Sequence, residues 1–109
     1  MTCPFESSTN RRAYIRLVYS PGRRPALLTA GARFEIIDIS ESGIRFHNPA
    51  HLPLPRSFQA RVTLLGGAAI DIAADVQWRE NEEVGISLAE PIPASVIRAE
   101  QRRAILQEM

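Results

Sequence analysis

The sequence contains no lysine and only one cysteine, and both shortages narrow what the chain can do. All 13 basic residues are arginines. Their planar guanidinium groups suit phosphates and guanine edges, although a GC-rich genome would produce the same bias. The single Cys3 excludes an internal disulfide and fits a reducing compartment. No apolar run approaches the roughly 20 residues of a membrane-spanning helix, and no signal-peptide pattern opens the chain. We therefore expect a cytoplasmic protein without membrane insertion.

The residue patterns of common catalytic and metal sites are also missing. His47 and His51 belong to no Ser-His-Asp arrangement, and there is no glycine-rich phosphate loop. On a helix, two histidines four residues apart could share a metal ion, but Pro49 disfavours a helix here and no third ligand lies nearby. We interpret this stretch as a surface loop and expect neither a metal site nor a cofactor. The chain should bind a ligand and should not be an enzyme.

The balance of charge argues against binding to nucleic acid. A formal net charge of +1 over 109 residues provides no broad positive field. An open barrel that holds single strands would also need a basic face studded with aromatic side chains. The alternating pattern instead predicts that Phe58 and Trp78 face inward and that Asp71 and Asp75 face outward. We therefore expect no nucleic-acid partner.

Short segments of alternating apolar residues, separated by tight turns, predict a mainly β protein. A chain of 109 residues suits one domain with a modest core. Five or six short strands followed by one helix are typical of an antiparallel barrel or sandwich with a terminal helix. The predicted strands are residues 25–29, 33–39, 44–46, 57–65, 70–79 and 84–88, and the predicted helix is residues 93–108.

The same pattern predicts which way side chains point. Phe34 and Ile36 should share one face of their strand, and Ile37 and Ile39 the other. On the helix, Glu100 should lie on the polar face, opposite a narrow apolar stripe. A stripe of this width indicates a helix that caps the domain. The stripe consists of Val96, Ile97, Ala104 and Ile105.

The stretch from Asp38 to Gly43 joins two strands and carries several polar side chains. Asp38 and Ser40 are two residues apart and should project from the same side of a strand. The sequence Glu41-Ser42-Gly43 predicts a three-residue loop with Gly43 in the left-handed conformation. Because Gly43 has no Cβ, a ligand could approach the backbone there. The same residues could instead be ordinary turn chemistry, since Asp and Ser readily bond nearby backbone groups.

Three arginines, Arg11, Arg12 and Arg16, precede the first predicted strand. Residues 1–10 contain little that could pack, so we expect a flexible tail there. Arginines in such a position are usually part of a solvated segment. The apolar neighbours of Arg16, Ile15 and Leu17, indicate that this segment is partly held against the body of the domain.

The pair Arg12-x-x-x-Arg16 and the sequence Asp38-x-Ser40-x-x-Gly43 together resemble the two motifs of the PilZ domain family of cyclic di-GMP receptors. The resemblance implies a six-stranded antiparallel β-barrel over about residues 17–90, followed by an α-helix, within a single domain over residues 11–109. It also implies a binding site for cyclic di-GMP. The implied ligand-binding residues are Arg11, Arg12, Arg16, Asp38, Ser40 and Gly43.

Family behaviour implies that ligand binding orders the arginine segment on the barrel, and that the signal then passes to a partner protein. Arginine can fork onto guanine O6 and N7 or pair with phosphate oxygens. Asp38 could accept from guanine N–H groups or hold an arginine in place, and Ser40 could bond a base edge or a phosphate. The alternative is a PilZ-like adaptor that binds a protein partner and does not bind a nucleotide. Some family members that lack the arginine motif act in this way.

Overall fold

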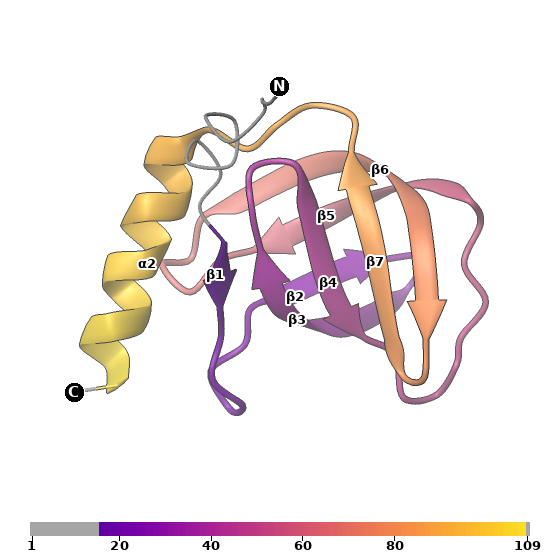
Figure 1. The fold of residues 1–109 in the computed structure, drawn as a ribbon, viewed down its shortest axis with the longest axis horizontal. Coiled ribbons are helices and arrows are strands. Elements are labelled where there is room, and N and C mark those ends of the chain that lie inside the picture. The colour runs from indigo at the N-terminus through magenta and orange to yellow at the C-terminus, as the bar shows by residue number, and fades with distance from the viewer. Residues whose placement is uncertain (1–15, 109) are drawn as a thin grey trace, which may run out of the picture.

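The computed structural model describes residues 16–108, with side chains as far as Ala104, and shows a barrel of strands with a C-terminal helix (Figure 1). The predicted tail, Arg11, Arg12 and the side chain of Ile105 lie outside this description. The elements are β1 (Leu17–Val18), β2 (Ala26–Thr29), β3 (Ala32–Ile39), β4 (Gly43–His47), β5 (Ser57–Thr63), β6 (Ala69–Glu80), β7 (Glu83–Leu88) and α2 (Ala94–Glu108).

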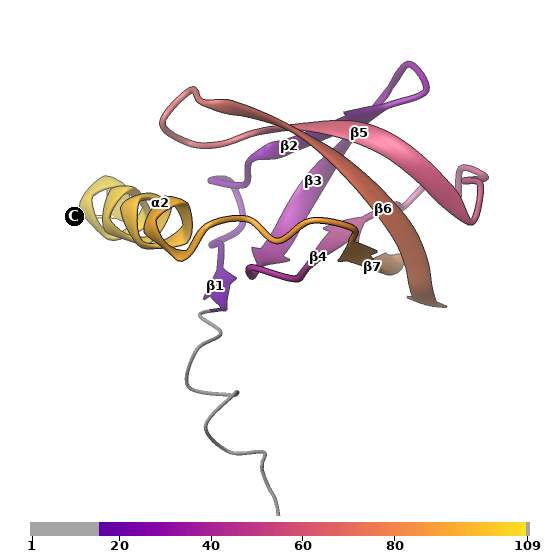
Figure 2. The same cartoon turned by 90° about the horizontal axis from the view of Figure 1, so that it is seen from above.

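Six of these strands close into an antiparallel barrel. Going round it, the order is β3, β2, β5, β6, β7 and β4, and β4 pairs again with β3. The short β1 adds to the C-terminal half of β3, where Leu17 lies opposite Ile39 and Val18 opposite Asp38. The helix α2 lies outside the barrel beside β1 (Figures 1 and 2). The six-stranded antiparallel barrel with a terminal helix, implied by the motifs, is therefore confirmed.

The core fills the barrel with the side chains that alternate inward along each strand. The rings of Phe34 and Phe46 pack with their centroids 5.1 Å apart, a spacing typical of tilted aromatic pairs. The helix contributes Ile97 and Ala104, so it covers the core as its apolar stripe predicts. The largest fully buried side chains are Phe46, Leu27, Ile36, Ile39, Ile97 and Val62.

Two irregularities correct the predicted orientations. The pairing of β3 with β4 shifts between Ile36 and Asp38, so Ile37 is an extra residue. Ile39 therefore joins Phe34 and Ile36 in the core, instead of sharing the other face with Ile37. The pairing of β6 with β7 shifts in the same way between Val76 and Trp78. Such bulges bend the strand and turn the residues after them to the opposite face.

Trp78 and Glu100 are the two side chains whose environments differ most from the expected ones. The bulge in β6 leaves Trp78 42% exposed, where a regular strand would direct it inward. Glu100 is buried, because it shares the helix face of Ile97 and Ala104, and its carboxylate accepts hydrogen bonds from Tyr19 and from the backbone of Leu65. The outward Trp78 removes one argument used against nucleic-acid binding, whereas Asp71 and Asp75 are exposed as expected.

Candidate functional site

A row of paired residues crosses the outer surface of the barrel. Val18 on β1 lies opposite Asp38 on β3, and Asp38 lies opposite Arg45 on β4. Arg45 in turn lies opposite Gly85 on β7, which lies opposite Trp78 on β6. Directly paired residues share a face, and neighbouring strands are about 4.8 Å apart. The row therefore places a carboxylate, a guanidinium and an indole side by side.

Asp38 is the buried charge of this row, with its side chain only 5% exposed. Its Oδ2 lies 2.8 Å from Nε of Arg45 and 3.8 Å from Nη1 of Arg16. Neither Oδ2 nor the Arg45 Nε–H has an aligned hydrogen-bond partner, so the short contact is an ion pair. Arg45 also lies 3.3 Å from Oε1 of Glu83 through its Nη1. Arg45 thus bridges two carboxylates, and the exposed Arg16 is the looser partner of Asp38.

Ser40 and Gly43 form the turn between β3 and β4. The Ser40 amide donates to the Gly43 carbonyl at 2.9 Å, and the Gly43 amide donates to Ser40 Oγ at 3.1 Å. Gly43 is not in the left-handed conformation that its sequence predicts, because it already belongs to β4. Its lack of a side chain matters for a different reason. An added Cβ would lie 3.0 Å from the carbonyl oxygen of Ile86 on β7.

The indole of Trp78 lies across β7 at Gly85. An added Cβ at Gly85 would overlap the five-membered part of the indole, so only glycine leaves space for the ring in this position. Gln77, the extra residue of the bulge, donates from Nε2 to Oγ of Ser87 at 2.9 Å. The bulge and Gly85 together present an aromatic face beside Arg45.

These groups surround one cavity of about 240 Å³, which we call the motif cavity. The structure brings together four of the six predicted ligand residues there, while Arg11 and Arg12 lie outside the described residues. Sequence reasoning missed Arg45, Gln77 and Trp78, which line the same space. The motif cavity is lined by Arg16, Asp38, Ser40, Ser42, Gly43, Ile44, Arg45, Gln77, Trp78, Gly85 and Ile86.

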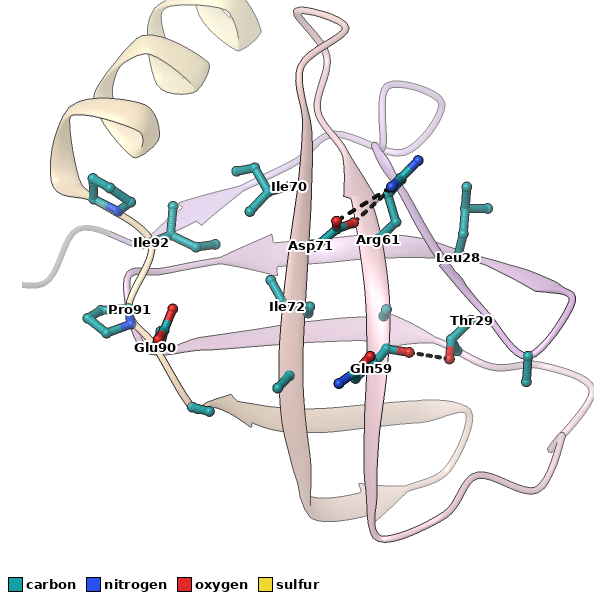
Figure 3. Close-up of a pocket in the computed structure, with 15 residues that line it drawn as sticks. Leu28, Thr29, Gln59, Arg61, Ile70, Asp71, Ile72, Glu90, Pro91 and Ile92 are labelled. Carbon is teal, nitrogen blue, oxygen red and sulfur yellow. Dashed lines mark hydrogen bonds and ion pairs between the residues drawn. The ribbon is translucent and has the colours of Figure 1, made fainter.

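A larger hollow of about 1000 Å³ lies over β5 and β6 and shares no lining residue with the motif cavity (Figure 3). Two of its three charged side chains are already paired, since Arg61 Nε donates to Asp71 Oδ1 at 2.9 Å, while Glu90 is the third. That hydrogen bond raises the pKa of Arg61 and lowers the pKa of Asp71, and both side chains are exposed. Figure 3 also shows Thr29 bonded to the backbone of Gln59. Among the described residues, this hollow therefore offers a ligand no guanidinium that is free of a carboxylate partner.

The two histidines lie away from the motif cavity. Nε2 of His47 lies 3.1 Å from Oε1 of Glu82, and His51 is exposed in the loop that follows β4. Across residues 16–108, no three side chains of the metal-binding types gather around one point. Nor does the same part of the chain contain a helix long and apolar enough to cross a membrane.

The family model of the PilZ domain matches residues 10–107, which is nearly the whole chain. The chain therefore belongs to the PilZ domain family, as its two motifs indicated. The match includes the segment that carries Arg11 and Arg12, as well as the barrel and the helix. No curated protein matches the chain in a direct comparison.

Among solved structures, the chain is similar to the crystal structure of an uncharacterized Legionella protein. The similarity has a TM-score of 0.60 and covers 86% of this chain and 95% of that one. Only 13% of the aligned residues are identical, so the similarity supports the fold alone.

Proposed function

We propose that this PilZ domain is a cytoplasmic receptor for cyclic di-GMP and that the ligand binds in the motif cavity. The observation that carries the proposal is the gathering of Arg16, Asp38, Ser40 and Gly43 around one space, with Trp78 as an aromatic wall. Membership of the PilZ family supports this ligand class. The proposal also assigns Arg11 and Arg12 to the ligand, on the basis of the motif alone.

Each ligand feature has a matching group in the motif cavity. A guanine base can stack on the exposed indole of Trp78, and base–aromatic stacking contributes about 1–3 kcal/mol. Arg16 is largely exposed, with its weaker contact to Asp38, so its guanidinium can turn to a guanine edge or a phosphate. The Ser40 hydroxyl already bonds the turn, and its oxygen can also bond a base edge.

Asp38 and Arg45 prepare the site before the ligand arrives. A buried carboxylate needs a partner, and Arg45 supplies one at 2.8 Å. Glu83 holds the other end of the Arg45 fork, so this arginine stays on the barrel wall. Asp38 can then accept from the N–H groups of guanine on its remaining side, while Arg45 offsets its charge.

The proposed signal is a change of surface. A ligand that contacts both Arg16 and the barrel wall would fix the arginine segment across the row of Val18, Asp38 and Arg45. A downstream protein partner would read that altered surface. The domain acts by binding, and we expect it to return cyclic di-GMP, GTP and ATP unchanged after incubation.

Calorimetric titration with cyclic di-GMP tests the proposal, with GTP and cyclic GMP as controls. We expect saturable binding of cyclic di-GMP and no comparable heat from the two controls. Asp38→Asn should weaken binding, whereas Asp71→Asn, at an exposed aspartate of the larger hollow, should not. Absence of binding to cyclic di-GMP would overturn the proposal and favour the adaptor alternative, in which the domain binds a protein and no nucleotide.

A further inference from the structure

The helix α2 carries a buried carboxylate that bonds two distant parts of the chain. Glu100 is only 3% exposed, and its Oε2 accepts from the hydroxyl of Tyr19 at 2.9 Å. The same oxygen accepts from the backbone N–H of Leu65 at 2.8 Å. Tyr19 is equally buried, at 3%. The helix is thus joined to the segment that follows Arg16 and to the hairpin between β5 and β6.

Stability alone gives little reason for a carboxylate at this position. A buried carboxylate loses its hydration and recovers that loss only through well-placed donors. An apolar side chain packed beside Ile97 and Ala104 could stabilise the helix as well. What Glu100 adds is direction, because its hydrogen bond fixes the Tyr19 hydroxyl at one point on α2. Burial, and then the nearby charge of Glu100, raise the pKa of Tyr19, which keeps the hydroxyl a donor.

Tyr19 is close in sequence to Arg16, which lines the motif cavity. It is three residues after Arg16, and its amide donates to the carbonyl of Ile37 at 2.9 Å, next to Asp38. The two residues between Arg16 and Tyr19 are the whole of β1, and so short a strand by itself holds Arg16 weakly. Fixing Tyr19 therefore fixes the end of β1 and, with it, the direction from which Arg16 reaches Asp38.

The chain leading into α2 is also hydrogen-bonded to the turn between β3 and β4. The amide of Leu88 donates to the carbonyl of Ser42 at 2.9 Å, and the amide of Ile92 donates to the carbonyl of Glu41 at 2.8 Å. Glu41 and Ser42 are the residues between Ser40 and Gly43 in the turn. The helix therefore connects to both sides of the motif cavity, through Tyr19 on one and through the turn on the other.

We propose that Tyr19 and Glu100 are positioning residues for Arg16, so that docking of α2 on the barrel and affinity for cyclic di-GMP are coupled. The proposal rests on the proposed function and assigns a regulatory role to the helix. A partner that pulls α2 from the barrel would loosen Arg16 and weaken ligand binding. By linkage, bound ligand would favour the docking of α2 by the same free energy by which docked α2 favours ligand binding.

The test compares Tyr19→Phe with the wild type and with Ile72→Val, a buried control on β6 that takes no part in the hydrogen bonds of Glu100 and does not line the motif cavity. Tyr19→Phe keeps the ring in the core and removes only the hydroxyl. We expect about a tenfold rise in the Kd for cyclic di-GMP, the size of effect that loss of one hydrogen bond to a charged group can produce. Amide hydrogen exchange without ligand should quicken at Leu17 and Val18 in Tyr19→Phe and not in Ile72→Val.

A second variant separates positioning from charge. Glu100→Gln can still accept both hydrogen bonds through its amide oxygen, so it should bind within about threefold of wild type. If the wild type binds and Tyr19→Phe binds equally well, the positioning role is wrong while the proposed function stands. If the wild type fails to bind, the proposed function falls, and the positioning role falls with it. If Ile72→Val weakens binding as much as Tyr19→Phe does, general loss of stability accounts for the effect and the proposal is overturned.

Discussion

The indole of Trp78 occupies the space that a side chain at position 85 would need, so Gly85 and Trp78 form one structural unit. Trp78 lies opposite Gly85 in the pairing of β6 with β7, just after the bulge. The exposed ring therefore does not depend on a flexible loop. It is held on the wall of the motif cavity by the register of two strands.

Gly85→Ala should displace the indole and weaken ligand binding about tenfold, because the new Cβ overlaps the ring and removes the stacking face. The fold should survive with a stability loss of about 1–3 kcal/mol, as for other overpacked positions. The tryptophan emission spectrum reports the displacement, and calorimetry reports the affinity. Ala73→Val, at an exposed position on β6, is the control and should change neither. A Gly85→Ala protein that binds normally would exclude Trp78 as a ligand contact.

Arg16→Ala should weaken binding of cyclic di-GMP by about tenfold or more, since one good arginine–guanine contact contributes about 1–3 kcal/mol. The thermal unfolding midpoint should stay close to that of wild type, because the side chain is 68% exposed. Arg16→Lys should restore little, as an ammonium cannot make the forked contact. Arg23→Ala removes an exposed arginine outside the motif cavity and is the matched control. Equal affinities for Arg16→Ala and Arg23→Ala would remove Arg16 from the site.

Asp38 and Arg45 should be energetically coupled. Arg45→Met leaves the buried carboxylate with only the longer contact to Arg16, so we expect a loss of about 1–3 kcal/mol in the free energy of unfolding. Adding Asp38→Asn should recover part of that loss, because the unpaired charge is gone. Urea unfolding of both single variants and the double variant measures the coupling. Additive losses would show that the 2.8 Å contact contributes nothing specific to stability.

Tyr19 should make the folded protein sensitive to alkali. Burial and the charge of Glu100 raise its pKa above the ordinary value of 10.0. As the pH rises, the Tyr19 hydroxyl loses its proton near pH 10 in the unfolded chain, whereas the folded chain still keeps it. The contribution of Tyr19 to the free energy of unfolding is therefore complete below about pH 10 and is lost as the pH rises above it. Urea unfolding at about pH 8 and about pH 11 should show a steeper fall in stability for wild type than for Tyr19→Phe. Parallel falls would indicate that Tyr19 ionises normally in the folded protein.

The barrel and the turn between β3 and β4 could be predicted because their signals are local. Alternation in β5 and β7 is read directly from the sequence, and the residues of the motif, Asp38, Ser40 and Gly43, follow one another on one turn. The bulges at Ile37 and Gln77 could not be predicted, because an extra residue is visible only against the partner strand. As a result, the outward direction of Trp78 and the contact of Asp38 with Arg45 were missed.

The burial of Glu100 was missed for a related reason. Helical spacing places Glu100 three residues after Ile97 and four before Ala104, on the apolar face, but its charge favours the solvent side. Only the folded chain brings Tyr19, 81 residues earlier, within hydrogen-bond reach. The spacing indicates the buried face, but the sequence does not show the two distant donors that make a buried carboxylate tolerable there. The predicted left-handed conformation of Gly43 is wrong, although the residues of the turn fit it. Glycine is needed at this position because β7 approaches it closely across the sheet.

The fluorescence of Trp78 tests the central claim most directly, because it is the single tryptophan in the chain and it lines the motif cavity. Titration with cyclic di-GMP should change its emission in a saturable way, with the same Kd that calorimetry gives. The change should disappear in Arg16→Ala and persist in Arg23→Ala. Saturable binding by calorimetry with no change in Trp78 emission would place the ligand elsewhere, and no binding by either method would contradict the account of this domain as a cyclic di-GMP receptor.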